Sequence, residues 1–197
     1  MKRRQLLGAL ITAGPALLVP SRSAQAQCEG ASDADTGFCQ DMSVHHAQAL
    51  VMCQRVLGRD TGEWVQAAAV EVLQNQAIEI GQMRAWLTDW GASTVPPVTV
   101  TVMGWMGANG GDGIPISDMP GYATDAELLE LSTLTGIAQG QRWLQLMRAH
   151  HVGGVTMASR AAELASSSKV VHLAEGQAAV QTYEIAQYDL LLAGPYA

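Results

Sequence analysis

Residues 38–52 read FCQDMSVHHAQALVM, and this stretch decides the fold because it occurs twice. Residues 143–157 read WLQLMRAHHVGGVTM, and the two copies align without a gap at an offset of 105 residues. The same offset relates residues 76–82, QAIEIGQ, to residues 181–187, QTYEIAQ. An ungapped register over separate segments indicates an internal duplication. Each copy is therefore expected to form the same structural unit.

Each copy is predicted to be a hairpin of two helices. Apolar residues recur at spacings of three and four through these segments, and proline is absent from them. The predicted helices cover residues 36–57 and 63–90 in the first copy and residues 139–165 and 168–192 in the second. Residues 58–62, GRDTG, are typical of a turn. A capping-box pattern at Thr124 and Glu127 predicts a further short helix before Gly136.

Residues 91–123 join the copies and are predicted to form a long linker without helical periodicity. They hold four prolines and many glycines, and residues 98–102 alternate as in a short strand. Two duplicated helical hairpins joined by a long crossover linker predict an all-α fold, a four-helix bundle of ferritin-like architecture. We expect a single domain over residues 27–197, with repeat 1 at about 36–90 and repeat 2 at about 124–192.

Residues 1–26 are predicted to be an export signal peptide. The basic residues 2–4, KRR, precede an apolar run over residues 6–20, and residues 24–26, AQA, form a small-x-small cleavage pattern. The run is shorter than the roughly 20 residues that a spanning helix needs, which disfavours a membrane anchor. Residues 3–7, RRQLL, resemble a twin-arginine motif. We therefore predict cleavage after Ala26 and a periplasmic or secreted location.

The mature chain is predicted to be strongly acidic. Cleavage removes four of the 11 basic residues and none of the 18 acidic ones, which changes the net charge from −7 to −11. Such a charge disfavours nucleic acid and anionic membranes as partners. It is compatible with the attraction of cations.

Three cysteines, Cys28, Cys39 and Cys53, remain for an oxidising compartment. Cys39 and Cys53 lie on one predicted helix, about 21 Å apart at 1.5 Å per residue, which is too far for a disulfide. Any bridge must therefore use Cys28, with Cys39 or Cys53 as its partner. We favour Cys39, because its helix begins close to Cys28.

The two His-His pairs are the candidate metal ligands. Neighbouring residues lie about 100° apart around a helix, so one imidazole of each pair can face the core while the other lies at the seam with the next helix. Heights along the hairpins place Glu79 level with the first pair and Glu184 level with the second. With pseudo-twofold symmetry, all four histidines would meet at one level. The candidate ligands are His45, His46, His150, His151, Met42, Met147, Met52 and Met157.

Imidazole and thioether together are ligands for copper, and thioether favours Cu(I). A glutamate beside a ligating histidine fixes the tautomer of that histidine. We therefore expect an exported copper-binding protein that prefers Cu(I), with another transition metal as the alternative. Its role would be copper buffering, tolerance, or delivery to or from a partner protein. The linker offers a second soft cluster, formed by Met103, Trp105, Met106 and Met119.

Two other classes of protein compete with this interpretation. Buried histidines bonded to glutamate can tie a structural bundle together, and methionine in a core is usually gap filler. A di-iron oxidoreductase of the bundle type would need Glu-x-x-His motifs, and a c-type haem protein would need Cys-x-x-Cys-His; the sequence contains neither. We therefore expect no catalytic residues. The metal content of untagged protein separates the three classes.

The pattern Phe38-x3-Met42-x2-His45-His46-x5-Met52, together with its second copy, resembles the family called domain of unknown function 305. The resemblance covers nearly the whole mature chain. It implies a ferritin-like four-helix fold, export to the periplasm or cell surface and, for some members, copper binding and copper tolerance. The His and Met pattern of the family carries over onto the eight candidate ligands. The copies differ elsewhere, since Met83 aligns with Tyr188, so we do not expect a fully symmetric site.

Overall fold

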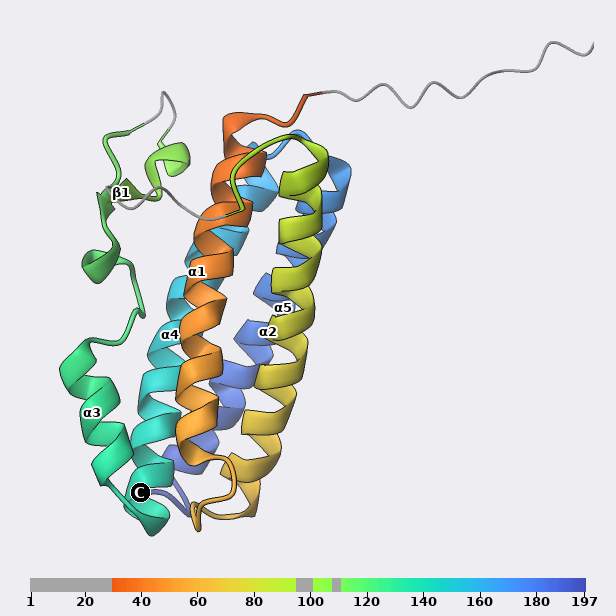
Figure 1. Ribbon diagram of the computed structural model, residues 1–197. Helices are drawn as coiled ribbons and strands as arrows, with labels where there is room; N and C mark the ends of the chain where they lie inside the picture. Colours follow the sequence, from red (N-terminus) through yellow and green to blue (C-terminus); the bar gives the residue numbers. More distant parts are fainter. Residues whose placement is uncertain (1–29, 95–100, 108–110) are drawn as a thin grey trace, which may run out of the picture.

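Four long helices form the body of the protein in the computed structural model, which describes residues 30–94, 101–107 and 111–197. They are α1 (Asp33–Val56), α2 (Glu63–Asp89), α4 (Gly136–Leu164) and α5 (Ser168–Leu192). α1 packs against α2 and α4, and α4 packs against α5 (Figure 1). The predicted helices are found with bounds shifted by at most three residues. The chain is thus mostly helical, as predicted, and the ferritin-like assignment stays a prediction.

α1 begins where Ser32 caps it. The Ser32 hydroxyl accepts from Asp35 N at 3.2 Å, and the Asp35 carboxylate accepts from Ser32 N at 2.8 Å, which makes a capping box. Asp35 also accepts from Ser166 Oγ at 2.8 Å and from Ser167 N at 3.0 Å, in the turn between α4 and α5. Burial raises the pKa of Asp35, but these hydrogen bonds together lower it. The start of α1 is therefore tied to the second hairpin.

The linker between the hairpins contains short elements. Its described residues form β1 (Thr101–Val102), η1 (Gly104–Met106), β2 (Ile114–Pro115) and η2 (Ile116–Asp118), and β1 pairs antiparallel with β2. Of the strand predicted over residues 98–102, only the last two residues belong to the described part of the chain. α3 (Asp125–Thr133) follows with the predicted capping box at its start. Figure 1 shows the linker and α3 beside α1 and α4, on the side away from α2.

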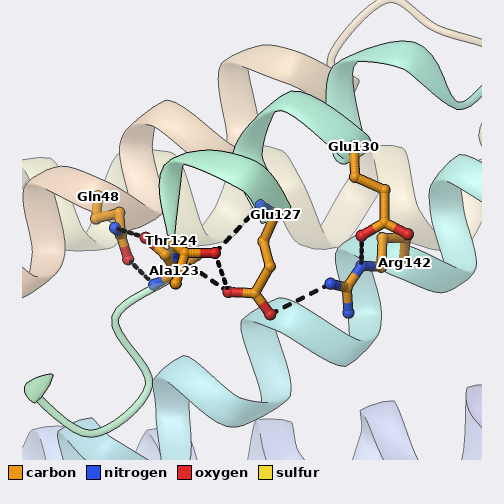
Figure 2. A network of polar contacts seen from close by, with 6 residues as sticks. All are labelled: Gln48, Ala123, Thr124, Glu127, Glu130 and Arg142. Carbon is orange, nitrogen blue, oxygen red and sulfur yellow. Dashed lines mark hydrogen bonds and ion pairs between the residues drawn. The ribbon is translucent and has the colours of Figure 1, made fainter. Parts of the chain in front are cut away.

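Polar contacts hold α3 against the long helices, as Figure 2 shows. Gln48 of α1 accepts from Ala123 N at 2.6 Å and donates to Ala123 O at 2.7 Å, so a buried side-chain amide satisfies both backbone groups. Arg142 of α4 forms ion pairs with Glu127 at 3.2 Å and Glu130 at 2.8 Å. These ion pairs are partly exposed and contribute little. Gln48 is therefore a buried polar anchor at this end of the linker.

Two hydrophobic clusters fill the space between the long helices, one toward each end. The first cluster includes Met52, Trp143 and Met147, and the second includes Phe38 and Met42. Between the clusters the buried side chains are histidines and glutamines. This polar layer is the candidate functional site.

The predicted signal peptide lies outside the described residues. Within residues 30–94, 101–107 and 111–197, no helix is long and apolar enough to cross a membrane.

Candidate metal centre

All four histidines of the two His-His pairs lie in one buried layer, and each is 0% exposed. α1 supplies His45 and His46, and α4 supplies His150 and His151. The rings of His45 and His150 stack, with centroids 3.7 Å apart and an interplanar angle of 21°. His46 and His151 flank this stack, with centroids 6.4 and 5.8 Å from that of His150. The structure thus brings together the four histidines that the sequence singled out.

Each ring of the stacked pair is tied to a backbone carbonyl. His45 Nε2 lies 3.2 Å from the Pro120 oxygen, and His150 Nε2 lies 2.8 Å from the His45 oxygen. A carbonyl oxygen only accepts, so each Nε2 carries the proton. Burial lowers the pKa of His45 to about 3, with a further contribution from the charge of His46, and burial lowers the pKa of His150 well below its usual value. Both rings are therefore neutral at pH 7.

The flanking histidines are each paired with a glutamate from the second helix of their own hairpin. His46 Nε2 lies 2.7 Å from Glu79 Oε2, and His151 Nε2 lies 2.6 Å from Glu184 Oε2. The glutamate side chains are 22% and 18% exposed, whereas the histidines are fully buried. A carboxylate that accepts from Nε2–H leaves Nδ1 with a free lone pair. Ligating histidines in metal sites are oriented by carboxylates in this way.

The Nδ1 atoms of all four histidines are buried and have no hydrogen-bond partner among the described residues. Buried polar atoms are nearly always paired, so four such atoms in one layer point to a missing partner. Two imidazoles on one ion have ring centres roughly 5–6.5 Å apart, given metal–nitrogen distances of about 2 Å. The separations of 5.8 to 6.4 Å between the flanking rings and the stack lie in this range. The four Nδ1 atoms are therefore the candidate nitrogen ligands of the layer.

The four candidate methionines lie on both sides of the histidine layer. Met42 and Met157 belong to one hydrophobic cluster, and Met52 and Met147 belong to the other. All four are 0% exposed. Each side of the layer thus receives one thioether from each hairpin. Among the residues that the structure describes, no three His, Cys, Asp or Glu side chains are grouped so that they could hold a metal ion, and methionine is outside that set of residue types.

The methionines of the linker pack onto the same cluster as Met42. Met119 is buried there, and the partly buried members are Met103, Trp105 and Met106. Asp41 of α1 anchors this segment, since its carboxylate accepts from Met103 N at 2.6 Å and from Trp105 Nε1 at 2.9 Å. Burial raises the pKa of Asp41, and the two hydrogen bonds only partly oppose this. The linker therefore adds thioethers at one end of the molecule.

Cys39 and Cys53 are both buried, and neither forms a disulfide with another residue in the described part of the chain. Burial raises the pKa of each thiol to about 12, so neither is a thiolate at pH 7. Cys28 lies outside the described residues, and its predicted bridge to Cys39 or Cys53 stays a prediction.

The linker closes the histidine layer on the side of α1 and α4, a feature that the sequence analysis missed. A Cβ at Gly153 would overlap the Pro120 carbonyl oxygen, and a Cβ at Gly121 would overlap the backbone of Ala149. Gly121 also has a φ of 77°, which glycine adopts readily. Two glycines thus allow the linker to lie directly on α4. The sequence did contain an indication of this contact, because the repeat is broken there: Gly153 aligns with Gln48 in the first copy.

A second missed residue is Gln177 of α5. Its side-chain amide lies 3.4 Å from His46 Nε2, so the second hairpin contacts the histidine of the first. Gln177 aligns with Val72 at the repeat offset. A search for residues shared by both copies therefore passes over it.

Comparisons with known proteins give one matching family profile and several solved structures with a similar fold. Residues 35–192 match the profile described as a domain of unknown function, DUF305. A predicted secreted DUF305 protein from Streptomyces coelicolor is 39% identical, with a TM-score of 0.72 over 81% of this chain and 92% of that chain. A DUF305 fragment from Deinococcus radiodurans is 28% identical, with a TM-score of 0.68 over 83% of this chain and 97% of that chain.

A further solved structure, CopM in its Cu(I)-bound form, shares the fold. It is 21% identical, with a TM-score of 0.64 over 83% of this chain and 98% of that chain. No curated protein sequence matches this chain. The family profile spans both hairpins and the linker between them, and the protein therefore belongs to the DUF305 family.

Proposed function

We propose that the protein is an exported copper-binding protein that holds Cu(I) at the histidine layer. The observation that carries the proposal is the pair of histidine–glutamate contacts, at 2.7 and 2.6 Å, behind two buried and unpartnered Nδ1 atoms. In this arrangement His46 and His151 supply nitrogen ligands, and Glu79 and Glu184 hold their tautomers. The four histidines of the layer are fully buried.

The preference for Cu(I) follows from the sulfur atoms beside the histidines. Thioether is a neutral, soft ligand that adds little affinity for Zn(II) but favours Cu(I). The thioethers on the two sides of the layer are those of Met42 and Met157, and of Met52 and Met147. His45 and His150 are further nitrogen donors, since their Nδ1 atoms are also unpartnered. The linker methionines would extend the soft region toward the surface.

The fold comparison is compatible with this proposal. CopM, which shares the fold, has been solved in Cu(I)-bound, Cu(II)-bound and Ag-bound forms. Its identity of 20–23% is too low to carry ligands across residue by residue. We infer a ferritin-like four-helix bundle for the body, and a periplasmic or secreted location from the signal-peptide pattern of residues 1–26. The carrier role covers copper buffering, tolerance, or exchange with a donor or acceptor protein.

The second candidate function is structural: the histidines would act as a staple, a hydrogen-bonded network that holds the helices together. It is favoured by one observation: each of the four buried histidines already has an oxygen acceptor within 3.2 Å of its Nε2 atom. A network satisfied in this way would stabilise the bundle without metal. It leaves the four Nδ1 atoms unexplained, because each buried unpaired acceptor costs about 1–3 kcal/mol.

Competition for Cu(I) separates the two candidates. The protein is titrated against a chromophoric Cu(I) chelator as wild type, His46→Ala, His151→Ala and the double variant. If both hairpins feed one site, each single change should remove most of the affinity and the double change little more. Two independent sites would instead lose about one equivalent per change. His172→Ala is the matched control, because His172 is exposed on α5.

Zn(II) should lose this competition, and Ag(I) should follow Cu(I). An unchanged Cu(I) stoichiometry and affinity in the double variant, with helicity intact, would mean that the histidines are a staple and that the copper proposal is wrong.

A further inference from the structure

A small cavity lies between α2 and α5, beside the histidine layer. Its volume is about 20 Å³, room for roughly one water or one dehydrated ion. The two glutamates of the histidine pairs, Glu79 and Glu184, line it from opposite helices. Its lining in the described part of the chain contains two carboxylates and no lysine or arginine. The cavity is therefore electronegative and attracts cations.

Three glutamines give the cavity a second feature. Gln76, Gln177 and Gln181 line it and are 4%, 2% and 3% exposed. Their Oε1 atoms have no hydrogen-bond partner among the described residues. A buried amide oxygen without a partner can accept a hydrogen bond or bind a cation. Carboxylate and amide oxygens at one place form a polar lining with ion-binding character.

The opposite side of the layer is closed. Pro120 accepts from His45 there, and Gly153 allows the linker to press directly onto α4. Two larger hollows lie elsewhere, one beside Gln48 and one beside Trp105. Neither is lined by a residue that is hydrogen-bonded to a histidine through its side chain. Of these three hollows, the cavity between α2 and α5 is the one lined by the glutamates that bind His46 and His151.

We propose that this cavity is the port through which the metal ion enters and leaves the histidine layer, with Gln76, Gln181, Glu79 and Glu184 as its transient oxygen ligands. The port rests on the proposed function. A soft ion binds oxygen weakly, and it binds nitrogen and sulfur tightly. These oxygen atoms therefore replace the water bound to the ion without holding the ion in the cavity. Passage requires sites favourable enough to enter and weak enough to leave. Glu79 and Glu184 then already contact the histidines that receive the ion.

A positive charge introduced at an exposed residue that lines the cavity tests the port and should perturb the fold little. Val180 lines the cavity and is 51% exposed. Val180→Lys should slow the transfer of Cu(I) from the protein to an excess of chelator by roughly tenfold at low salt, because the ammonium repels the passing cation. High salt should restore the rate, since screening shortens the reach of the charge. Val70→Lys is the matched control: Val70 is 42% exposed on α2 and does not line the cavity.

A second variant removes the oxygen ligands themselves. In Gln76→Leu/Gln181→Leu the transfer rate should fall at least roughly tenfold, while the Cu(I) dissociation constant stays within about threefold. A gate changes uptake and release by the same factor, whereas a ligand changes the equilibrium. Gln74→Leu is the control, because Gln74 is exposed on the same helix and is not part of the lining. Helicity is measured for every variant.

The outcomes are distinct. Slower transfer with an unchanged dissociation constant supports the port. Unchanged transfer in both Val180→Lys and the folded glutamine variant overturns the port and leaves copper binding at the histidines intact. A large loss of affinity in the glutamine variant makes these residues permanent ligands, which also overturns the port. Loss of Cu(I) binding in wild type would remove the proposed function, and the port with it.

Discussion

The hairpins α1–α2 and α4–α5 agree in their histidine–glutamate pairs and differ at several positions of the hydrophobic core. The contacts His46–Glu79 and His151–Glu184 match within 0.1 Å. Around them, Cys53 of the first hairpin corresponds to a buried Ala158 in the second. A hydrophobic core tolerates exchange of one apolar side chain for another, whereas a buried polar pair fails when either partner is lost. The polar layer therefore tolerates fewer substitutions than the hydrophobic packing around it.

The hairpins also differ where the linker touches them. Gly153 of α4 faces the Pro120 carbonyl, and its counterpart Gln48 of α1 instead binds Ala123. The linker thus covers two equivalent helices by two different contacts. A single linker cannot contact both hairpins symmetrically about a twofold axis. The stacked histidines, His45 and His150, lie against the linker and therefore have unlike partners. The flanking histidines each keep a glutamate partner, although His46 also contacts Gln177, whose counterpart in the first copy is Val72.

The largest expected effect comes from the matched aromatic anchors. Phe38 and Trp143 occupy equivalent positions, and both are 0% exposed. Phe38→Ala and Trp143→Ala should each lower the free energy of unfolding by about 3–5 kcal/mol, because each leaves a cavity. Chemical denaturation measures this. Tyr183→Ala is the exposed control and should stay within about 0.5 kcal/mol of wild type. A large cost at only one anchor would show that the two cores are not equivalent.

Acid should destabilise the metal-free protein through the stacked pair. The unfolded chain binds a proton at each histidine near pH 6.5, while burial lowers the folded pKa of His45 to about 3 and that of His150 in the same direction. As pH falls below 6.5, protons favour the unfolded state, and stability is lost from there toward the folded pKa. Each group should cost about 2 kcal/mol between pH 6.5 and pH 5.

Denaturation in chelator at several pH values measures this slope. His150→Asn removes one of the two groups and should roughly halve the loss over the same window. A loss of equal size in wild type and His150→Asn would contradict the assignment, since other groups would then carry the pH dependence.

The sequence predicted the periodic parts of the molecule and missed the aperiodic ones. Helix bounds and the shared level of the histidines and glutamates follow from a rise of 1.5 Å per residue, and the structure places them as expected. The path of the linker has no period, so its contact with His45 through Pro120 could not be derived. Gln177 was missed because it has no counterpart in the first copy. The copper titration tests the roles of His46 and His151, and the roles of the other six candidate ligands remain predictions.

Neighbouring glycines on α4 should respond very differently to alanine. At Gly153 an added Cβ meets the backbone oxygen of Pro120, which cannot move without shifting the linker; at Gly154 it meets the side-chain amide of Gln181, which is flexible. Alanine in a helix contributes about 1 kcal/mol relative to glycine, and overpacking costs about 1–3 kcal/mol. Gly153→Ala should therefore destabilise, while Gly154→Ala should be near neutral.

Urea denaturation of the two variants gives the comparison directly. The first hairpin carries Ala49 at the position equivalent to Gly154, which supports tolerance there. Equal stabilities for the two variants would mean that the linker does not press on α4.

The smallest expected effect on copper affinity tests whether the asymmetric thiol takes part in the site. Cys53 is fully buried in the same cluster as Met52 and Met147, and burial raises its pKa to about 12. A protonated thiol packs as a small apolar side chain. Cys53→Ala makes the first hairpin match Ala158 of the second, and removing one buried heavy atom should cost about 0.5–1.5 kcal/mol. Cu(I) affinity should stay within about twofold, because the imidazole and thioether ligands remain. A tenfold loss of affinity, with the stability change as small as expected, would show that copper binding deprotonates Cys53 and uses its sulfur. The copper site would then lie on the side of the first hairpin rather than between equal halves.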